Sequence, residues 1–387
     1  MTSTTVKVPF VDLSLQHHPI HSRLEQAMLE VVRQGDFILG QALTEFETAF
    51  AQACGVEYGV GVASGTSAIA LGLQACGIGV GDEVLIPTNT FIATVIGALQ
   101  AGATPILVDC DPHTALIDLE AAAQAVTSRT KAVIPVHLYG QMVSPRQLLD
   151  FADTYNLLVF EDAAQAHLAY REGFRSGSVG TAAAFSFYPS KNLGAFGNGG
   201  MLVTGDEALA KKVRSLRNYG APQKYFHTEP GTNSRLDTIQ AAVLKVKLPY
   251  LPQWNEARYR AAQQYDRSLK LTQHFLSAIE NQSGSGHVYH LYVVQLHPER
   301  DRQVIQEQLA SRGIQTGIHY PVPCHLQPAY KYLGYRLGDF PCAEALSNRI
   351  FSLPMYPGIS DHQIQFVCEQ LSLLSDSFLG CQNQTIV

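Results

Sequence analysis

The sequence lacks any excess of positive charge. Lysine and arginine together number 27 against 33 aspartate and glutamate residues, so the formal net charge is −6 at pH 7. Proteins that bind the phosphate backbone of nucleic acids usually carry clustered positive charge. We therefore expect no nucleic-acid partner, and an anionic ligand has to be held by local groups.

Long apolar runs are also missing. No run approaches the roughly 20 apolar residues that a membrane-spanning helix needs. Residues 1–7 contain no basic segment followed by an apolar one, which a secretion signal would have. The sequence therefore predicts a cytoplasmic protein that does not bind membranes.

Motifs for metals, disulfides and two common active sites are absent as well. The seven cysteines are widely spread with no Cys-x-x-Cys pair, so we expect free thiols. None of the 14 histidines has the helical or cysteine-paired spacing of a metal site, so we expect no metal. There is no Gly-x-Ser-x-Gly nucleophile elbow, and Gly77-x-Gly79-x-Gly81 precedes an expected strand, whereas a dinucleotide-binding loop follows one.

Short apolar runs alternate with longer helix-like stretches between residues 55 and 205. This alternation predicts an α/β fold with a seven-stranded, mostly parallel sheet sandwiched by helices. The expected strands are residues 58–63, 83–87, 104–108, 132–136, 157–161, 183–187 and 200–204. Ligands of such folds bind at the carboxyl ends of the strands, so functional side chains are sought directly after each run.

The length of 387 residues favours two domains. We expect a large α/β domain at residues 1–250 and a smaller α+β domain at residues 251–387. The second domain begins with a helical pattern and continues into a strand-like run at residues 288–296. The first forty residues are expected to wrap onto the small domain.

One lysine follows an expected strand. Lys191 lies on the loop between strands 183–187 and 200–204, among aromatic and small residues. Burial there would depress its pKa and leave a neutral amine, which attacks aldehydes and forms imines with pyridoxal phosphate. Taken alone, a solvated lysine is the simpler interpretation, so the assignment depends on its neighbours.

Two other segments suit a phosphate group. Gly65 and Thr66 directly follow strand 58–63 and open an alanine-rich helix, whose N-terminal amides favour an anion. Ser186, five residues before Lys191, offers a second hydroxyl. A plain serine or threonine helix cap is the structural alternative for the first segment.

Three residues suit a pyridine ring. Asp162 follows strand 157–161, and a carboxylate beside the ring nitrogen would keep that nitrogen protonated and make the ring an electron sink. Gln165 is placed to meet the ring hydroxyl, and Phe91 to stack on the ring. A helix cap for Asp162 and a core position for Phe91 are the alternatives.

In combination, these motifs resemble the DegT/DnrJ/EryC1/StrS family of pyridoxal-phosphate-dependent nucleotide-sugar aminotransferases of fold type I, nearly from end to end. The matching segments are residues 64–68 (Ser-Gly-Thr-Ser-Ala), 87–91 (Pro-Thr-Asn-Thr-Phe), 161–167 (Glu-Asp-Ala-Ala-Gln-Ala-His), 186–194 (Ser-Phe-Tyr-Pro-Ser-Lys-Asn-Leu-Gly) and 231–237 (Gly-Thr-Asn-Ser-Arg-Leu-Asp).

The resemblance implies a role for each residue. Lys191 would form the Schiff base, Asp162 would pair with the pyridine nitrogen, Gln165 would meet the ring hydroxyl, Phe91 would stack on the ring, and Gly65, Thr66 and Ser186 would hold the phosphate. It also implies a homodimer in which Asn233 reaches the cofactor phosphate of the neighbouring subunit. Dehydratases of this family carry histidine in place of the lysine, so Lys191 argues against that branch.

Within the family, the chain resembles enzymes that aminate a 3-keto-6-deoxyhexose on thymidine diphosphate (dTDP), with L-glutamate as the usual donor. The segments are residues 216–220, 223–225, 287–290 and 317–321 followed by His325. Candidate substrate contacts are Tyr188, Lys224, Tyr225, His319, Tyr320 and His325. A 4-keto nucleotide sugar, a cyclic ketone such as an inosose, and a non-catalytic cofactor-binding regulator stay open as alternatives. Two departures from the subgroup are Ser190 in place of glycine and Asn198 in place of an acidic residue.

Overall fold

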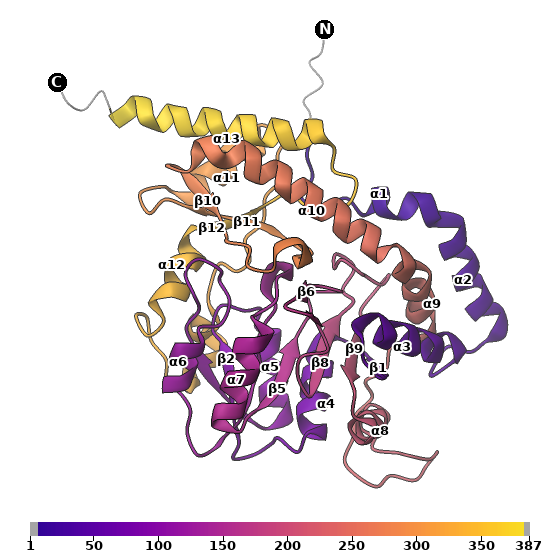
Figure 1. Cartoon of the computed structure of the whole chain (residues 1–387). Helices are drawn as coiled ribbons and strands as arrows, with labels where there is room; N and C mark the ends of the chain where they lie inside the picture. The colour runs from indigo at the N-terminus through magenta and orange to yellow at the C-terminus, as the bar shows by residue number, and fades with distance from the viewer. Residues whose placement is uncertain (1–6, 383–387) are drawn as a thin grey trace.

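The computed structural model describes residues 7–382 and contains the expected seven-stranded sheet (Figure 1). The strand order is β1 (Tyr58–Val62), β9 (Gly200–Thr204), β8 (Ala182–Ser186), β5 (Leu158–Asp162), β4 (Thr130–Val133), β2 (Glu83–Pro87) and β3 (Thr104–Val108). Strands β8, β5, β4, β2 and β3 pair in parallel, and β9 runs antiparallel to both of its neighbours. The predicted fold class is confirmed.

Strand β4 differs from the expected residues 132–136, because it begins and ends earlier. Pro135 has no backbone N–H to continue the ladder, so regular pairing stops before it. Its carbonyl still accepts a hydrogen bond of 2.9 Å from the backbone N–H of Asp162. This bond holds the carboxyl end of β5 beside the segment that follows β4.

Helices cover both faces of the sheet because the side chains of each strand alternate in direction. In β9, Leu202 belongs to a core formed with α4 (Gly65–Ala75), while Met201 and Val203 belong to a second core formed with α3 (Gln41–Cys54). Helix α4 lies very close to the sheet, since a side chain at Gly72 would collide with the ring of Phe160. The helices α5 (Ala93–Ala101), α6 (Leu119–Gln124), α7 (Pro145–Tyr155) and α8 (Glu207–Leu216) add side chains to the core of α4, and α9 (Thr238–Lys247) adds side chains to the core of α3.

A second, antiparallel sheet lies toward the C-terminus. Its order is β10 (Leu276–Ala278), β11 (Tyr292–Leu296) and β12 (Ile350–Leu353). The helices around it are α10 (Leu251–Ser268), α11 (Arg302–Ser311), α12 (Pro341–Arg349) and α13 (Asp361–Gln382), and α13 lies against α10 (Figure 1). Side chains of β11 alternate between the main core, with Val293, and a separate core, with Val294. The predicted boundary at residue 250 stays a prediction.

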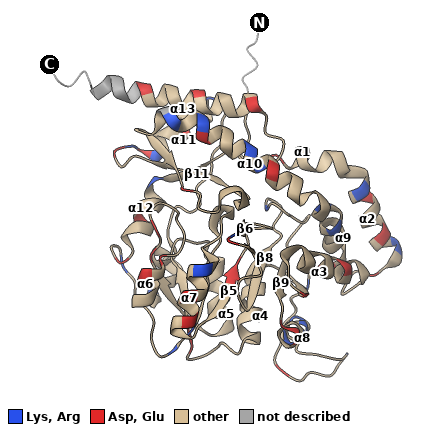
Figure 2. Ribbon diagram, viewed as in Figure 1, with Lys and Arg blue, Asp and Glu red and all other residues tan. Residues whose placement is uncertain are grey.

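The N-terminal segment contacts distant parts of the chain. Val8 forms a backbone bridge with Ile314, beside α11, and α2 (His21–Gln34) packs along α9. Other short elements include α1 (Leu13–His17), β6 (Tyr170–Arg171) and β7 (Phe174–Arg175). Figure 2 shows acidic and basic residues interspersed along the outer helices. Within residues 7–382, every helix is too short or too polar to cross a membrane.

Candidate active site

A cavity of about 440 Å³ lies where the carboxyl ends of β5 and β8 meet the N-terminus of α4. Most of the residues predicted for the site line it: Gly65, Thr66, Phe91, Asp162, Gln165, Ser186, Tyr188, Lys191, His319 and Tyr320. They come from segments up to 255 positions apart in the chain, since the first is residue 65 and the last is residue 320. The fold therefore gathers the predicted strand-end groups into one place.

Lys191 follows β8 on a tight turn, in which its backbone N–H donates to the carbonyl of Tyr188 at 2.9 Å. Lys191 is one of the residues that line the cavity. Burial lowers the pKa of Lys191 to about 8, and the nearby carboxylate of Asp162 opposes this shift. A substantial fraction of the amine is therefore neutral near pH 7.5, as a nucleophile or proton carrier requires.

Asp162 is the last residue of β5 and is buried. Its Oδ2 accepts a hydrogen bond of 2.7 Å from the hydroxyl of Thr94, and its Oδ1 accepts one of 3.1 Å from the backbone N–H of Ala164. Burial raises the pKa of Asp162, while these two bonds and the charge of Lys191 act in the opposite direction. The carboxylate is thus desolvated but fixed, which suits pairing with a cationic ring nitrogen.

The N-terminus of α4 lines the same cavity as this carboxylate. Ser64 caps α4 by accepting a hydrogen bond of 3.1 Å from the backbone N–H of Ser67, so the first turn of the helix is open to the cavity. A Cβ atom at Gly65 would lie 2.9 Å from the Cβ of Ser186. Only glycine therefore lets the positive end of α4 approach Ser186 this closely, and the pair could hold a phosphate.

Residues 19–372 match the model of the DegT/DnrJ/EryC1/StrS aminotransferase family. The chain belongs to this family. It is 42% identical to dTDP-3-amino-3,4,6-trideoxy-α-D-glucose transaminase of Streptomyces venezuelae, over 93% of this chain and 94% of the relative. It is 41% identical to UDP-N-acetyl-3-dehydro-α-D-glucosamine 3-aminotransferase of Acidithiobacillus ferrooxidans, over 94% and 96%.

Two solved structures superpose closely on this aminotransferase. DesV of S. venezuelae, in complex with a ketimine intermediate, has a TM-score of 0.92 at 40% identity and covers 96% of this chain and 99% of its own. NtdA of Bacillus subtilis, with bound cofactor PMP, has a TM-score of 0.88 at 31% identity, over 97% and 87%. The chain is a pyridoxal-phosphate-dependent aminotransferase.

The donor set of this aminotransferase fits that cofactor. A lysine of lowered pKa suits the aldehyde, a buried carboxylate suits the ring nitrogen, and the glycine-lined cradle beside Ser186 suits the phosphate. Phe91 is 52% exposed and faces Tyr320 at 5.3 Å between ring centroids. Gln165 accepts from the backbone N–H of Tyr139 at 2.7 Å and donates to the Tyr320 hydroxyl at 3.0 Å, so its amide orientation is fixed.

Three predicted residues of the aminotransferase lie away from this cavity. Asn233 is exposed, and its backbone pairs with Asn218. Lys224 and Tyr225 are also exposed, on the same long loop between α8 and α9, with Tyr225 at 84%. An exposed loop is available to a second chain, so the roles predicted for these residues stay predictions.

His325 also lies outside the lining of this cavity. Its Nδ1 lies 2.9 Å from the Thr88 hydroxyl and its Nε2 lies 3.0 Å from Glu344 of α12. The ring is buried, and both of its nitrogens are engaged by protein groups outside the cavity. His325 therefore anchors the segment that follows His319 and Tyr320, and the substrate contact predicted for it stays a prediction.

The sequence reasoning missed several residues around the cavity of the aminotransferase. Thr90 and His290 line the cavity, and the Thr94 hydroxyl donates a hydrogen bond to the carboxylate of Asp162. The spacing of Thr90 and Thr94, four apart at a helix start, was a usable signal, because it places two hydroxyls on one side of a turn. The two departures from the subgroup, Ser190 and Asn198, also line the cavity.

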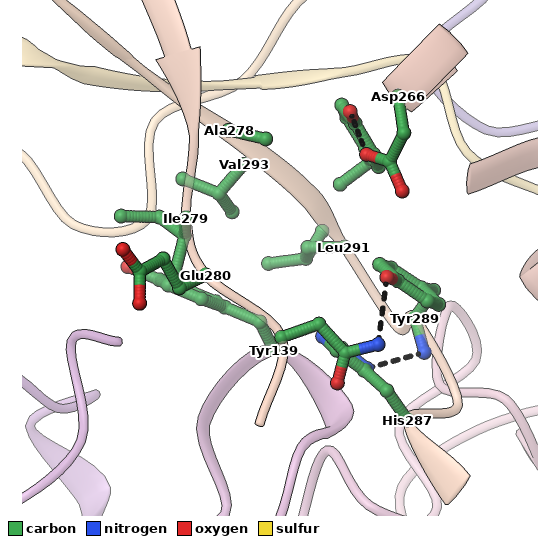
Figure 3. Close-up of a pocket in the computed structure, with 11 residues that line it drawn as sticks. Tyr139, Asp266, Ala278, Ile279, Glu280, His287, Tyr289, Leu291 and Val293 are labelled. Atoms are coloured by element: carbon green, nitrogen blue, oxygen red, sulfur yellow. Dashed lines mark hydrogen bonds between the residues drawn. The ribbon is translucent and has the colours of Figure 1, made fainter. Parts of the chain in front are cut away.

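A second cavity of about 200 Å³ lies under β10 and β11 (Figure 3). His287 and Tyr289 line it, with the backbone N–H of Tyr289 donating to His287 Nδ1 at 3.0 Å. Tyr139 connects the two cavities, because its ring lines the second one while its hydroxyl donates to the carbonyl of His319 at 2.7 Å. In the described part of the chain, no three His, Cys, Asp or Glu side chains are grouped to hold a metal ion.

Proposed function

We propose that this aminotransferase moves an amino group from L-glutamate to C3 of a dTDP-linked 3-keto-6-deoxyhexose, in a cytoplasmic homodimer. The observation that carries the chemistry is the placement of Lys191, with its lowered pKa, and the buried carboxylate of Asp162 in one cavity. The S. venezuelae relative, named for a dTDP-3-amino sugar, supports the substrate.

Each part of the cofactor would be bound by different residues of the chain. Asp162 would face the ring nitrogen, Gln165 would meet the ring hydroxyl, and Phe91 would cover one face of the ring. Gly65, Thr66 and Ser186 would hold the phosphate, assisted by Asn233 of a second chain. When bound, pyridoxal phosphate supplies an aldehyde that exchanges amines and a ring that accepts the electrons of a broken C–H bond.

Lys191 carries the protons. In the first half-reaction its free Nζ would take the α-proton of glutamate and return it on the cofactor side, and in the second it would take a proton there and deliver it to the sugar carbon that receives the amine. A pKa of about 8 suits both directions, because neither protonation state of the amine is rare near neutral pH. Phe91 and Tyr320, whose ring centroids lie 5.3 Å apart, both line the cavity and supply apolar surface beside this transfer.

The nucleotide and the ring position separate the alternatives. The A. ferrooxidans relative is named for a UDP-linked 3-keto sugar. The two relatives therefore agree on the ring position and differ in the nucleotide, so the identity of the nucleotide is the less constrained part of the proposal. A 4-keto nucleotide sugar and an inosose are further candidates. A cofactor-bound regulator would show the colour of the bound cofactor without turnover.

The test uses purified protein in two steps. Glutamate should abolish the visible absorption of the lysine-bound cofactor, and one member of a panel of 3-keto and 4-keto dTDP and UDP sugars should restore it. Borohydride should fix the cofactor to the peptide that contains Lys191, and Lys191→Ala should lose turnover while the exposed-lysine control Lys211→Ala keeps it. Cofactor on another peptide, or no response to glutamate, contradicts the proposal.

A further inference from the structure

His290 lies in the wall of the active-site cavity, just before β11. The residue is 8% exposed, and its Nδ1 lies 3.2 Å from Oδ1 of Asn192, the residue that follows Lys191. No role follows for His290 from the chemistry described so far. Its hydrogen-bonding state is nevertheless determined by its neighbours.

Two backbone carbonyls fix the orientation of the side-chain amides of Asn192 and Asn255 near this ring. Asn192 Nδ2 donates to the carbonyl of Val288 at 2.9 Å and to Oδ1 of Asn255 at 2.9 Å. Asn255 Nδ2 in turn donates to the carbonyl of His167 at 2.9 Å. A carbonyl oxygen only accepts, so neither amide can be reversed without losing a buried hydrogen bond. The oxygen of Asn192 must therefore point toward His290.

The tautomer of His290 follows from this orientation. Because Asn192 Oδ1 only accepts, the hydrogen of the neutral imidazole is on Nδ1. Burial, together with the charges of Lys191 and Arg258, holds the pKa of His290 well below its usual value, so the ring stays neutral. Nε2 is then a bare acceptor, and within residues 7–382 no side chain or backbone group donates to it.

We propose that Nε2 of His290 accepts a hydrogen bond from a hydroxyl of the sugar ring, close to the carbon that is aminated, and that it selects sugars by this hydroxyl. The inference rests on the proposed function. A bare imidazole nitrogen repels carboxylates, phosphates and keto oxygens, since all of them are acceptors, and it requires an O–H or N–H donor. Lys191 could have supplied one, but its Nζ makes no hydrogen bond to His290 in the described structure.

The closing experiment compares the two half-reactions of the holoenzyme by stopped-flow absorption. His290→Leu removes the acceptor, and we expect the sugar half-reaction to lose about 10- to 100-fold in kcat/KM, because a buried polar group of the substrate is left unpaired. The glutamate half-reaction should change less than twofold. His290→Gln, whose amide oxygen still accepts, should recover most of the loss.

Two controls make the result specific. His287→Gln alters the same segment but faces the second cavity (Figure 3), so it should change neither half-reaction. A substrate analogue that lacks the contacted hydroxyl should react slowly with wild type, and His290→Leu should no longer distinguish it from the full substrate. Melting temperatures of all variants separate this loss from unfolding.

The tautomer itself is read by ¹⁵N NMR of histidine-labelled holoenzyme, with His290→Gln used to assign the signal. A protonated Nδ1 and a bare Nε2 are expected, and Asn192→Ala should mix the tautomers. A hydrogen on Nε2, an equal loss in both half-reactions, or no loss in the sugar half-reaction overturns the inference. A wild-type enzyme that aminates no nucleotide sugar refutes the proposed function instead, and with it the sugar as the donor to Nε2.

Discussion

Thr94 donates a hydrogen bond of 2.7 Å from its hydroxyl to Oδ2 of Asp162. Thr94 lies in the first turn of α5, and Asp162 ends β5, so the bond joins a helix start to a strand end. The Thr94 hydroxyl also lies 2.9 Å from that of Thr90, which lines the cavity. The two threonines therefore form a buried support for the carboxylate that is proposed to meet the cofactor ring.

Thr94→Val should reduce transamination about tenfold at pH 7, because removing a hydrogen bond to a charged group costs about 1.5 kcal/mol or more. The bond lowers the pKa of Asp162, so its loss raises that pKa further and protonates the carboxylate at higher pH. The acidic limb of the rate profile against pH should therefore move upward. Thr94→Ser keeps the hydroxyl and should retain the wild-type profile. An unchanged profile in the valine variant contradicts the assigned role.

This bond illustrates where sequence reasoning ends. Asp162 was predictable because an acidic residue directly after an apolar run emerges at a strand end, whatever the rest of the fold does. The bond from Thr94 was not predictable, although its spacing from Thr90 was a signal, since its partner Asp162 lies 68 positions away and only the packing of α5 on the sheet brings the two residues together. The surroundings of His325 were not predictable for the same reason: its place in a motif gave no information about Thr88 and Glu344, which engage both ring nitrogens.

Gly65→Ala should weaken cofactor binding about tenfold or more. The new methyl group would lie 2.9 Å from Cβ of Ser186, so the N-terminus of α4 would have to move away from the Ser186 hydroxyl. Titration of the apo-protein with pyridoxal phosphate, followed by absorption, measures the effect. Gly205→Ala is the matched control, because its added Cβ meets no atom within 4 Å. Equal affinities of the two variants would show that the close approach is not used for phosphate binding.

Lys191→Met should stabilise the cofactor-free protein at neutral pH. Burial lowers the pKa of Lys191 from 10.5 to about 8, so the folded state binds fewer protons than the unfolded state between these values, and stability rises with pH across that window. The cost of the buried charge is fully present below pH 8 and is at most about 3 kcal/mol at 1.4 kcal/mol per pKa unit.

Urea unfolding of both apo-proteins tests this expectation. Methionine has a similar shape and no charge, so the variant should gain roughly 1–3 kcal/mol at pH 7, and its advantage should vanish near pH 10.5. A gain that does not depend on pH would mean that packing, and not the desolvated ammonium, is responsible. A loss of stability at pH 7 would contradict the burial argument directly.

Asn233 and Lys191 should complement each other between subunits. If Asn233 of one chain completes the phosphate site of the other, Asn233→Ala and Lys191→Ala each inactivate a homodimer. In a mixed dimer, however, the site that contains the intact Lys191 also receives the intact Asn233 from its partner. One of the two sites is then complete, and random mixing makes half of all dimers mixed, so about a quarter of wild-type activity should return.

The two possible positions of Asn233, in its own site or in that of the partner, predict different activities for the mixed dimers. If Asn233 served its own chain, each mixed dimer would have one site without the lysine and one without the asparagine, and no activity would return. Asn233 is exposed and lies outside the cavity of its own chain, which favours the first arrangement. The mixing is done by unfolding and refolding together or by co-expression with two tags, and each variant alone gives the baseline. Sedimentation of the wild-type protein establishes whether two chains associate, and a monomer that is fully active would refute the shared site.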